Sequence, residues 1–448
     1  MAMTRQLVHL EPPQGFLNDP NGLCFFRGIA YVFHQWNRFA CDRSYKEWGC
    51  FCSCDLIHWE HRGTGILPDT PYDKNGCYSG SAVVEDDVMH LFYTGNVRNE
   101  DGGRTPYQCH AASTDGRTFV KELHPMPPPS GYSEHFRDPF VWKGHDAWWM
   151  MVGAQDIENR GCIALYSSDD GTNWTYRGKH AGDAYAAMCE CPSLGRVGER
   201  GVLLTCPQER SVGASGERVT RRWSQYELGN FDEIEGSFAA SDKPRMLDRG
   251  FDFYAPQLVN APDGRCLLWA WMSGMTPEEE IKCPTRGEGF LHCLTFPREL
   301  SLCDGELVQR PIREIDAMVT RCSEHRGDAG TLSAAGACLF RFRCGPDARS
   351  VQIELGSGGF SLHWDRERAS VTLTRPGFSS WGKTSIVDDL EALQSLELLW
   401  DMTSVEAFIN GGRRVYSSRL FGVSDRFVIY YGLGSSGMAA RLELEANG

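Results

Sequence analysis

The 448-residue chain has no apolar stretch that approaches the roughly 18 uninterrupted apolar residues that a membrane-spanning helix requires. Basic residues are also few, with 45 lysines and arginines against 59 aspartates and glutamates and a formal net charge of -14. This deficit argues against nucleic acid or an anionic lipid surface as the main partner and fits a neutral or cationic ligand. We therefore expect a small-molecule partner, with no membrane and no nucleic acid.

Residues 1–10 show no charged head followed by an apolar stretch, so no signal peptide is recognisable there. The 18 cysteines would suggest disulfides in a secreted protein, but disulfide frameworks are typical of short chains with little core. Several of these cysteines instead lie in strand-like runs, as small buried apolar residues do. We predict a protein with reduced thiols that is located in the cytoplasm.

Long runs with a helical period of 3.6 residues are nearly absent from the sequence. The chain consists instead of short β-like runs separated by Gly, Pro, Asn and Asp, for example residues 28–33, 88–93, 147–152 and 265–271. This pattern predicts an all-β protein.

An internal repeat indicates how these strands are organised. A Ser-x-Asp turn with an aromatic residue six positions after the serine occurs at residues 53–59, 113–119 and 168–174, in copies 60 and 55 residues apart. Each copy follows an apolar run, so we expect it to connect the outer strands of a repeated four-stranded unit. Radial repetition of such units is typical of a β-propeller, and residues 1–310 would hold about five of them. Coincidental Ser-x-Asp turns are the alternative.

The pattern changes after residues 298–313, which are predicted to form a crossing strand and a connector. From about residue 332 onward, alternating strands return without the repeated turn, and Asn410-Gly411 is a hairpin signal because both residue types accept positive φ. We predict a linker at 311–330 and a β-sandwich at 331–448, an accessory domain without catalysis.

Three carboxylates differ from the other acidic residues because they lie among turn formers and aromatics. Asp19, Asp138 and Glu190 occur in Asn-Asp-Pro-Asn-Gly, Arg-Asp-Pro and Glu-Cys-Pro segments, 119 and 52 residues apart. The first strands of propeller blades converge around a central axis, so these acids can meet in one pocket. The nearby prolines fix the local backbone.

Paired carboxylates on a pocket floor are what glycoside hydrolysis requires, one as nucleophile or base and one as acid. Asp19 and Asp138 have shorter side chains on tighter turns, whereas Glu190 lies between Cys189 and Cys191, which solvate poorly. Burial there predicts a raised pKa for Glu190, as a general acid needs. Taken singly, each segment also fits a structural role as a turn, an ion pair or a strand-end acid.

The three segments, in this order and spacing, resemble glycoside hydrolase family 32, the β-fructofuranosidases (invertases, sucrose-6-phosphate hydrolases, inulinases and levanases). The resemblance covers nearly the whole chain and implies a five-bladed β-propeller followed by a β-sandwich. Further matching segments are residues 33–37, 48–59, 78–83, 252–257, 271–272 and 292–300.

The resemblance also implies roles for individual residues. Asp19 would be the nucleophile that forms a covalent fructosyl-enzyme, Glu190 the acid and base, and Asp138 the stabiliser of the transition state. No metal or other cofactor is implied. The positions that match substrate-binding residues are Asn18, Gln35, Trp48, Tyr78, Ser79, Arg137, Tyr254 and Trp271.

The sequence departs from the family pattern on the aglycone side of the pocket. Ser193 stands where the family commonly has Asp, Cys50 where it often has His, and Arg43 where secreted invertases carry a tryptophan. Arg43 and Lys46 are candidate contacts for a phosphate, which would suit sucrose 6-phosphate, although solvated loop charges are the simpler interpretation.

We therefore expect a retaining hydrolase that releases terminal β-D-fructofuranosyl units from sucrose and short fructo-oligosaccharides, with sucrose 6-phosphate as a further candidate substrate. A fructosyltransferase with the same covalent intermediate is the main alternative. A non-catalytic sugar-binding protein and an inverting propeller hydrolase of arabinose polymers are weaker ones. The sequence leaves the preferred substrate and the oligomeric state open.

Overall fold

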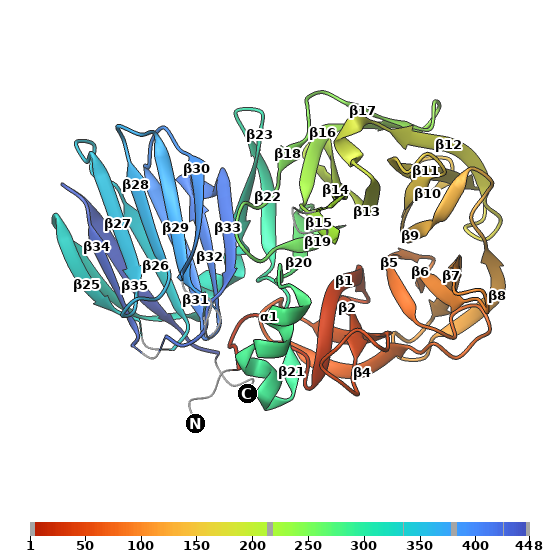
Figure 1. Ribbon diagram of the computed structural model, residues 1–448, viewed down its shortest axis with the longest axis horizontal. Helices are drawn as coiled ribbons and strands as arrows, with labels where there is room; N and C mark the ends of the chain where they lie inside the picture. Colours follow the sequence, from red (N-terminus) through yellow and green to blue (C-terminus); the bar gives the residue numbers. More distant parts are fainter. Residues whose placement is uncertain (1–4, 213–217, 335, 378–382, 424, 445–448) are drawn as a thin grey trace. The chain divides into compact units, whose positions relative to one another are not determined.

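The computed structural model describes residues 5–212, 218–334, 336–377, 383–423 and 425–444. These residues form strands almost throughout, with only short helices between them, which confirms the prediction of an all-β protein (Figure 1). No helix among the described residues is long and apolar enough to cross a membrane. The chain divides into two compact units: unit 1 comprises Met1–Glu11, Asp248–Phe253 and Met272–Gly448, and unit 2 comprises Pro12–Leu247 and Tyr254–Trp271.

The strands of unit 2 pair in chain order into successive antiparallel groups. The first group is β1 (Gly15–Phe26), β2 (Ile29–Asn37), β3 (Glu47–Ser53) and β4 (Glu60–Ile66). The second is β5 (Cys77–Glu85), β6 (Val88–Arg98), β7 (Arg104–Ser113) and β8 (Val120–Met126). The third is β9 (Tyr132–Lys143), β10 (Trp148–Asp156), β11 (Gly161–Ser168) and β12 (Thr175–Ala181).

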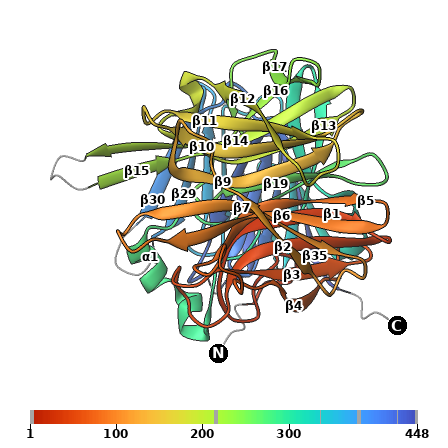
Figure 2. The ribbon, with the colours of Figure 1, turned by 90° about the vertical axis from the view of Figure 1, so that its right-hand side faces the viewer.

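The fourth group is longer and follows the 3-10 helix η1 (Asp183–Tyr185). It contains β13 (Met188–Val197), β14 (Arg200–Val212), β16 (Gln225–Asp232) and β17 (Ser237–Ala240), with β15 (Arg218–Arg222) on β14 and β18 (Arg245–Met246) on β16. Strand β15 extends away from the rest of this sheet (Figure 2). Two further strands of unit 2, β19 (Tyr254–Asn260) and β20 (Cys266–Trp271), pair with each other.

The first strands of these groups form a closed ring. Strand β1 contacts β5, β5 contacts β9, β9 contacts β13, β13 contacts β19, and β19 returns to β1. Figure 1 shows β1, β5, β9 and β13 around a common centre, with the later strands of each group farther out. Residues at the same level of these five strands are therefore neighbours, although they are far apart in the sequence.

The repeated Ser-x-Asp segment forms the same turn three times. It connects β3 to β4, β7 to β8 and β11 to β12, which confirms its predicted place between outer strands. The hydroxyls of Ser53, Ser113 and Ser168 donate to the aspartate two residues later at 2.9–3.0 Å and accept the backbone N–H three residues on. These local hydrogen bonds explain the recurrence of the motif, because each satisfies the backbone of a tight turn.

Unit 1 contains two six-stranded antiparallel sheets. One has the order β24 (Val319–Arg326), β35 (Ser436–Leu442), β26 (Cys338–Arg343), β31 (Ser395–Asp401), β32 (Ser404–Ile409) and β33 (Arg414–Arg419). The other has the order β25 (Ala329–Ser333), β34 (Phe427–Tyr431), β27 (Ser350–Leu355), β28 (Ser361–Asp365), β29 (Ser370–Pro376) and β30 (Lys383–Asp389). The remaining elements are β21 (Phe290–Leu291), the pair β22 (Arg298–Cys303) and β23 (Glu306–Pro311), α1 (Pro277–Lys282), and the 3-10 helices η2 (Pro284–Glu288), η3 (Arg313–Met318) and η4 (Asn410–Gly412).

The two six-stranded sheets share one apolar cluster, to which each contributes alternate residues. In β29 every second side chain is buried, as expected of a strand with one face in a core. The cluster includes Phe340 and Leu398 from one sheet and Ile353 and Trp364 from the other, all almost fully buried. Residues 311–330, predicted as a linker, contain η3 and β24, so strand pairing begins inside that segment.

A buried charge network holds the N-terminal segment of unit 1. The ring of His9 contacts Asp401 Oδ2 at 3.1 Å and Glu406 Oε1 at 3.0 Å, and all three side chains are fully buried. Arg298, also fully buried, contacts Glu406 and lies 3.1 Å from Asp248. Burial lowers the pKa of His9, but the two carboxylates overcome this effect and raise it to about 9. His9 is therefore a cation at neutral pH.

The raised pKa of His9 predicts a specific loss of stability in alkali. The stabilisation is complete below the ordinary histidine pKa of 6.5 and is lost as the pH rises through about 9. We expect the free energy of unfolding to fall by about 3 kcal/mol more in the native protein than in His9→Gln between pH 6.5 and 9.5. Urea denaturation at both pH values measures this, with the exposed His363→Gln as control. An equal fall in His9→Gln would contradict the assignment.

Candidate active site

The candidate site of unit 2 lies where each of the five ring strands changes its pairing register with the neighbouring strand of its group. A bulge of this kind bends a strand and re-aims its side chains. All five strands of the ring have such a shift, between Leu17 and Pro20 in β1, Cys77 and Gly80 in β5, Arg137 and Phe140 in β9, Glu190 and Ser193 in β13, and Tyr254 and Gln257 in β19.

Three of these shifts place a non-glycine residue in the left-handed region directly before a proline. The φ angles are 64° at Asp138, 48° at Cys191 and 50° at Ala255. Proline disfavours a helical conformation of the preceding residue, and positive φ costs free energy for residues with a Cβ atom. Backbone strain of this kind persists only where the surroundings impose it, and it is common at functional sites.

Asp19 accepts hydrogen bonds from three side chains of β1, β2 and β5. Ser79 Oγ donates to Asp19 Oδ2 at 2.6 Å, and Gln35 Nε2 donates to the same oxygen at 3.4 Å. Asn18 Nδ2 donates to Asp19 Oδ1 at 3.1 Å, while Lys46 Nζ donates to Asn18 Oδ1 at 2.7 Å. The carboxylate is thus fixed in orientation, as a nucleophile requires.

Glu190 is held from both of its oxygens. The guanidinium of Arg137 contacts Oε1 with two nitrogens, one of them Nε at 3.0 Å. Tyr254 donates its hydroxyl to Oε2 at 2.6 Å, and the Gln208 amide donates to the same oxygen. Four strands therefore converge on this carboxylate, since these residues lie on β9, β13, β14 and β19.

The structure corrects the expected direction of the Glu190 pKa. Burial raises the pKa, but Arg137, Arg222 and the Tyr254 hydroxyl outweigh burial and bring it down to about 2. The neighbours of Glu190 in the chain are apolar and by themselves would raise its pKa. The expectation was wrong because the cations that face Glu190 come from other strands.

Asp138 shows the opposite shift. Burial raises the pKa of this carboxyl, the charges of Glu190 and Asp19 raise it further against the effect of Arg137, and the result is about 7. Its Oδ2 accepts a hydrogen bond from Cys191 N at 3.1 Å. Burial and the neighbouring carboxylates therefore favour the protonated form of Asp138 over that of Glu190.

A small cavity connects the surroundings of Asp19 with those of Asp138. Its volume is about 10 Å³, the space of one water molecule. Its lining includes Pro20, Ser79, Asp138 and Cys191. The side chains around Asp19 and around Asp138 thus face one common space.

Three residues that were predicted to contact the sugar, Trp48, Tyr78 and Trp271, lie near this cluster, and their contacts differ from one another. Trp48 is fully buried and donates its indole N–H to the Tyr78 carbonyl at 2.9 Å, so it holds the backbone that precedes Ser79. Trp271 packs against Phe16 with the ring centres 6.2 Å apart. Direct sugar contacts of Trp48, Tyr78 and Trp271 stay predictions.

Arg43 and Lys46 both lie over the Phe16 ring, 5.6 and 5.8 Å from its centre, and Arg43 is also 5.6 Å from the Trp271 ring. Since Lys46 also contacts Asn18, these two charges border the candidate site.

Gln208 and Arg222 were not expected from the sequence. Gln208 pairs with Met188 across β13 and β14, and Arg222 pairs with Gln208 across β14 and β15. Their approach to Glu190 thus depends on strand pairing. The only local signal was a polar Pro-Gln step directly after the apolar run at residues 202–206.

The chain is similar to known proteins over most of its length. The sequence profile described as "Glycosyl hydrolases family 32 N-terminal domain" matches residues 9–311. A sucrose-6-phosphate hydrolase of Salmonella typhimurium is 38% identical over 427 residues, covering 92% of this chain and 88% of the relative. A raffinose invertase of Escherichia coli is 35% identical over 438 residues, covering 94% and 90%. The solved structure of sucrose-6-phosphate hydrolase from Lactobacillus gasseri has a TM-score of 0.88 at 29% identity, covering 98% and 93%.

The raised pKa of Asp138 predicts that its ionisation destabilises the protein. The folded protein keeps a proton between pH 3.8 and about 7 that the unfolded chain releases, so this group lowers the free energy of unfolding as the pH rises through that window. Asp138→Asn should therefore raise the unfolding temperature at pH 8 by about 2–4 °C, and by less at pH 5.

Calorimetry of the two proteins at both pH values measures this effect. Asp169→Asn, an exposed aspartate of the same unit, is the control and should show no pH-dependent gain. A gain for Asp138→Asn that is equal at pH 5 and pH 8 would show that Asp138 is not the protonated group.

Proposed function

Because the chain belongs to glycosyl hydrolase family 32, we propose that it hydrolyses β-D-fructofuranosidic bonds and releases terminal fructosyl units from sucrose, sucrose 6-phosphate and short fructo-oligosaccharides. The observation that carries the proposal is the cluster of the buried Asp138 with the half-buried Asp19 and Glu190. The related proteins are named as hydrolases or invertases, which favours water over a second sugar as the acceptor and so disfavours the fructosyltransferase alternative.

We further propose a five-bladed β-propeller at residues 1–310 and a β-sandwich at 331–448; residues 311–330 connect the two and, through β24, add a strand to one sheet of the sandwich. The closed ring of β1, β5, β9, β13 and β19 and the three equivalent outer turns support the propeller. The apolar cluster common to the two six-stranded sheets supports the sandwich. The free thiols of Cys189, Cys191 and Cys206 support a reducing compartment and hence the cytoplasm.

The proposed reaction proceeds with retention through two displacements. Asp19 attacks the anomeric carbon of the fructosyl unit, while Glu190 protonates the departing oxygen. Glu190 then removes a proton from the water that hydrolyses the fructosyl-enzyme. The three hydrogen bonds that fix Asp19 support its role as the attacking group, because they orient its carboxylate before substrate arrives.

We propose that the proton needed for the first step comes from Asp138, because burial and the neighbouring carboxylates favour its protonated form. Fructose hydroxyls that donate to Asp138 would favour its ionised form, because hydrogen bonds to a carboxylate lower its pKa. The proton then passes to Glu190, whose own charge is balanced by Arg137 until that moment. Ionised Asp138 would stabilise the oxocarbenium-like transition state. The pair thus titrates as one unit.

Removal of the nucleophile tests the central assignment. Asp19→Ala should lose at least about 10⁴-fold in kcat on sucrose, because the covalent step has no other acceptor. Fructose release from sucrose, sucrose 6-phosphate, 1-kestose, inulin and levan is measured for this variant, the native protein and Asp169→Asn. The native protein releasing no fructose from any of them would refute the activity, and near-native turnover in Asp19→Ala would refute the nucleophile.

A phosphate contact at Arg43 would appear as substrate specificity. Arg43→Gln should raise the KM for sucrose 6-phosphate about 10-fold, since a charge-assisted hydrogen bond contributes about 1.5–3 kcal/mol. The kcat/KM on sucrose should stay within about twofold, because surface substitutions away from the reacting groups have small effects. Arg117→Gln, another exposed arginine of unit 2, is the control. An equal change on both substrates would exclude a phosphate contact.

A further inference from the structure

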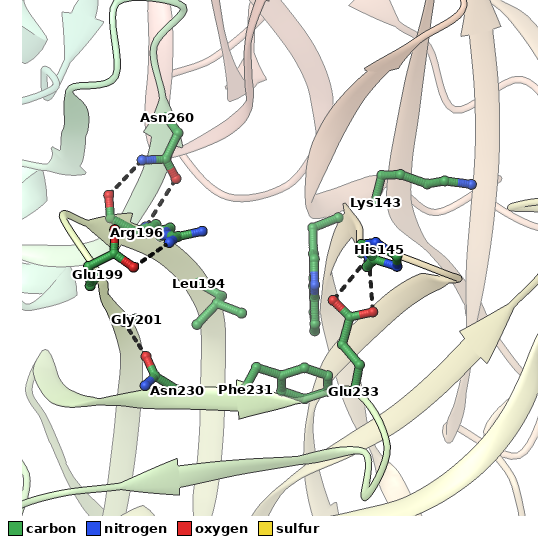
Figure 3. A pocket seen from close by; sticks show the side chains of 13 residues that line it. Lys143, His145, Leu194, Arg196, Glu199, Gly201, Asn230, Phe231, Glu233 and Asn260 are labelled. Carbon is green, nitrogen blue, oxygen red and sulfur yellow. Dashed lines mark hydrogen bonds and ion pairs between the residues drawn. The ribbon is translucent and has the colours of Figure 1, made fainter.

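A cavity of about 630 Å³ lies in unit 2, at the opposite ends of the strands that carry the candidate catalytic residues (Figure 3). Lys143 follows Asp138 by five positions along β9, and Arg196 follows Glu190 by six along β13. Asn260 follows Tyr254 by six along β19. At about 3.3 Å per residue these spacings correspond to roughly 15–20 Å, so the cavity is separate from the candidate active site.

The apolar part of the cavity is the open end of a hydrophobic cluster between two sheets. Trp142, Leu194 and Phe231 belong to this cluster but are only half-buried. The Trp142 ring is stacked on Trp149 at 6.4 Å and 18°, and it meets Phe231 edge-on at 4.9 Å and 87°. The orientation of the ring is thus set before any ligand binds, which lowers the entropic cost of binding.

Polar groups with fixed orientations surround this apolar surface. Asn260 accepts from Arg196 N at 3.0 Å and donates to Arg196 O at 2.7 Å. Glu233 accepts the backbone N–H of His145 with both oxygens, at 3.0 and 3.1 Å, and Asn230 Oδ1 accepts a backbone N–H at 3.2 Å. Figure 3 shows Asn260, Arg196 and Asn230 on one side of the cavity and His145 and Glu233 on the other.

The charges around the cavity cancel. Lys143 and Arg196 are matched by Glu199 and Glu233, and Arg196 lies 3.1 Å from Glu199. A charged ligand would gain no net attraction from such a lining. Aromatic rings beside amide and carboxylate groups instead suit a neutral molecule that has both C–H faces and many hydroxyls.

We propose that this cavity binds a neutral oligosaccharide, with a sugar ring stacked on Trp142 and its hydroxyls bonded to Asn230 and Glu233. The volume falls within the range of about 300–1,000 Å³ that is usual for small-molecule sites. None of the lining residues belongs to the candidate active site, so the inference does not rest on the proposed hydrolysis.

Titration calorimetry with nystose and with maltotriose tests the proposal in the Asp19→Ala background, which keeps fructosides intact. The expected result is a binding event that Trp142→Ala weakens at least about 10-fold, because stacking and apolar contact are lost together. Trp174→Ala, which truncates another half-buried tryptophan of unit 2, is the matched control and should preserve that event.

Asn230→Ala is a second variant that leaves the aromatic packing intact. It should weaken the same event about fivefold, the equivalent of one hydrogen bond of about 1 kcal/mol. Circular dichroism verifies that each variant is folded. Absence of any sugar binding that depends on Trp142 or Asn230 overturns the proposal. This outcome is distinct from failure of the proposed hydrolysis, because it is scored by binding at the cavity and not by fructose release.

Discussion

In each of the five ring strands of unit 2 the pairing register with the next strand shifts at the same level. The candidate catalytic side chains lie on the residues at these shifts. In a regular strand Arg137 and Asp138 would point to opposite faces, because successive side chains alternate. The left-handed backbone of Asp138 removes this alternation, so that Arg137 reaches Glu190 while Asp138 reaches the backbone of Cys191. The strained conformation is therefore the condition under which two adjacent residues can serve the same site.

Because the three carboxylates lie close together, the protonation of each depends on the charges of the other two. Three carboxylates in a poorly solvated space repel one another, and the half-buried guanidinium of Arg137 compensates only part of their charge. Because Arg137 is bonded to Glu190, the remaining repulsion acts mainly on Asp138 and raises its pKa. In the proposed mechanism Glu190 and Asp138 therefore titrate as a coupled pair, and sugar hydroxyls bound to Asp138 would shift the proton towards Glu190.

The outer turns could be predicted from the sequence, whereas the pKa of Glu190 could not, and the two outcomes have different physical causes. The outer turns at Ser53, Ser113 and Ser168 are local hydrogen-bonded structures, so their motif is visible in the chain. The pKa of Glu190 depends on Arg222 and Tyr254, whose approach requires strand pairings that no local pattern encodes. Nor does the sequence distinguish Trp142, half-buried at a cavity, from Trp149, buried beside it.

The two ends of the ring strands are physically separated, although the same strands build both. An apolar cluster that includes Phe140, Cys189 and Leu203 begins next to Glu190 and ends at Trp142. The separation of roughly 15–20 Å along the strands exceeds the Debye length of about 8 Å at physiological ionic strength. The exposed charges of the cavity are screened by salt and therefore act only weakly on the carboxylate cluster. A sugar seated on Trp142 would leave the protonation of Asp138 and Glu190 unchanged, so we expect the cavity to influence the proposed hydrolysis by holding substrate near the protein.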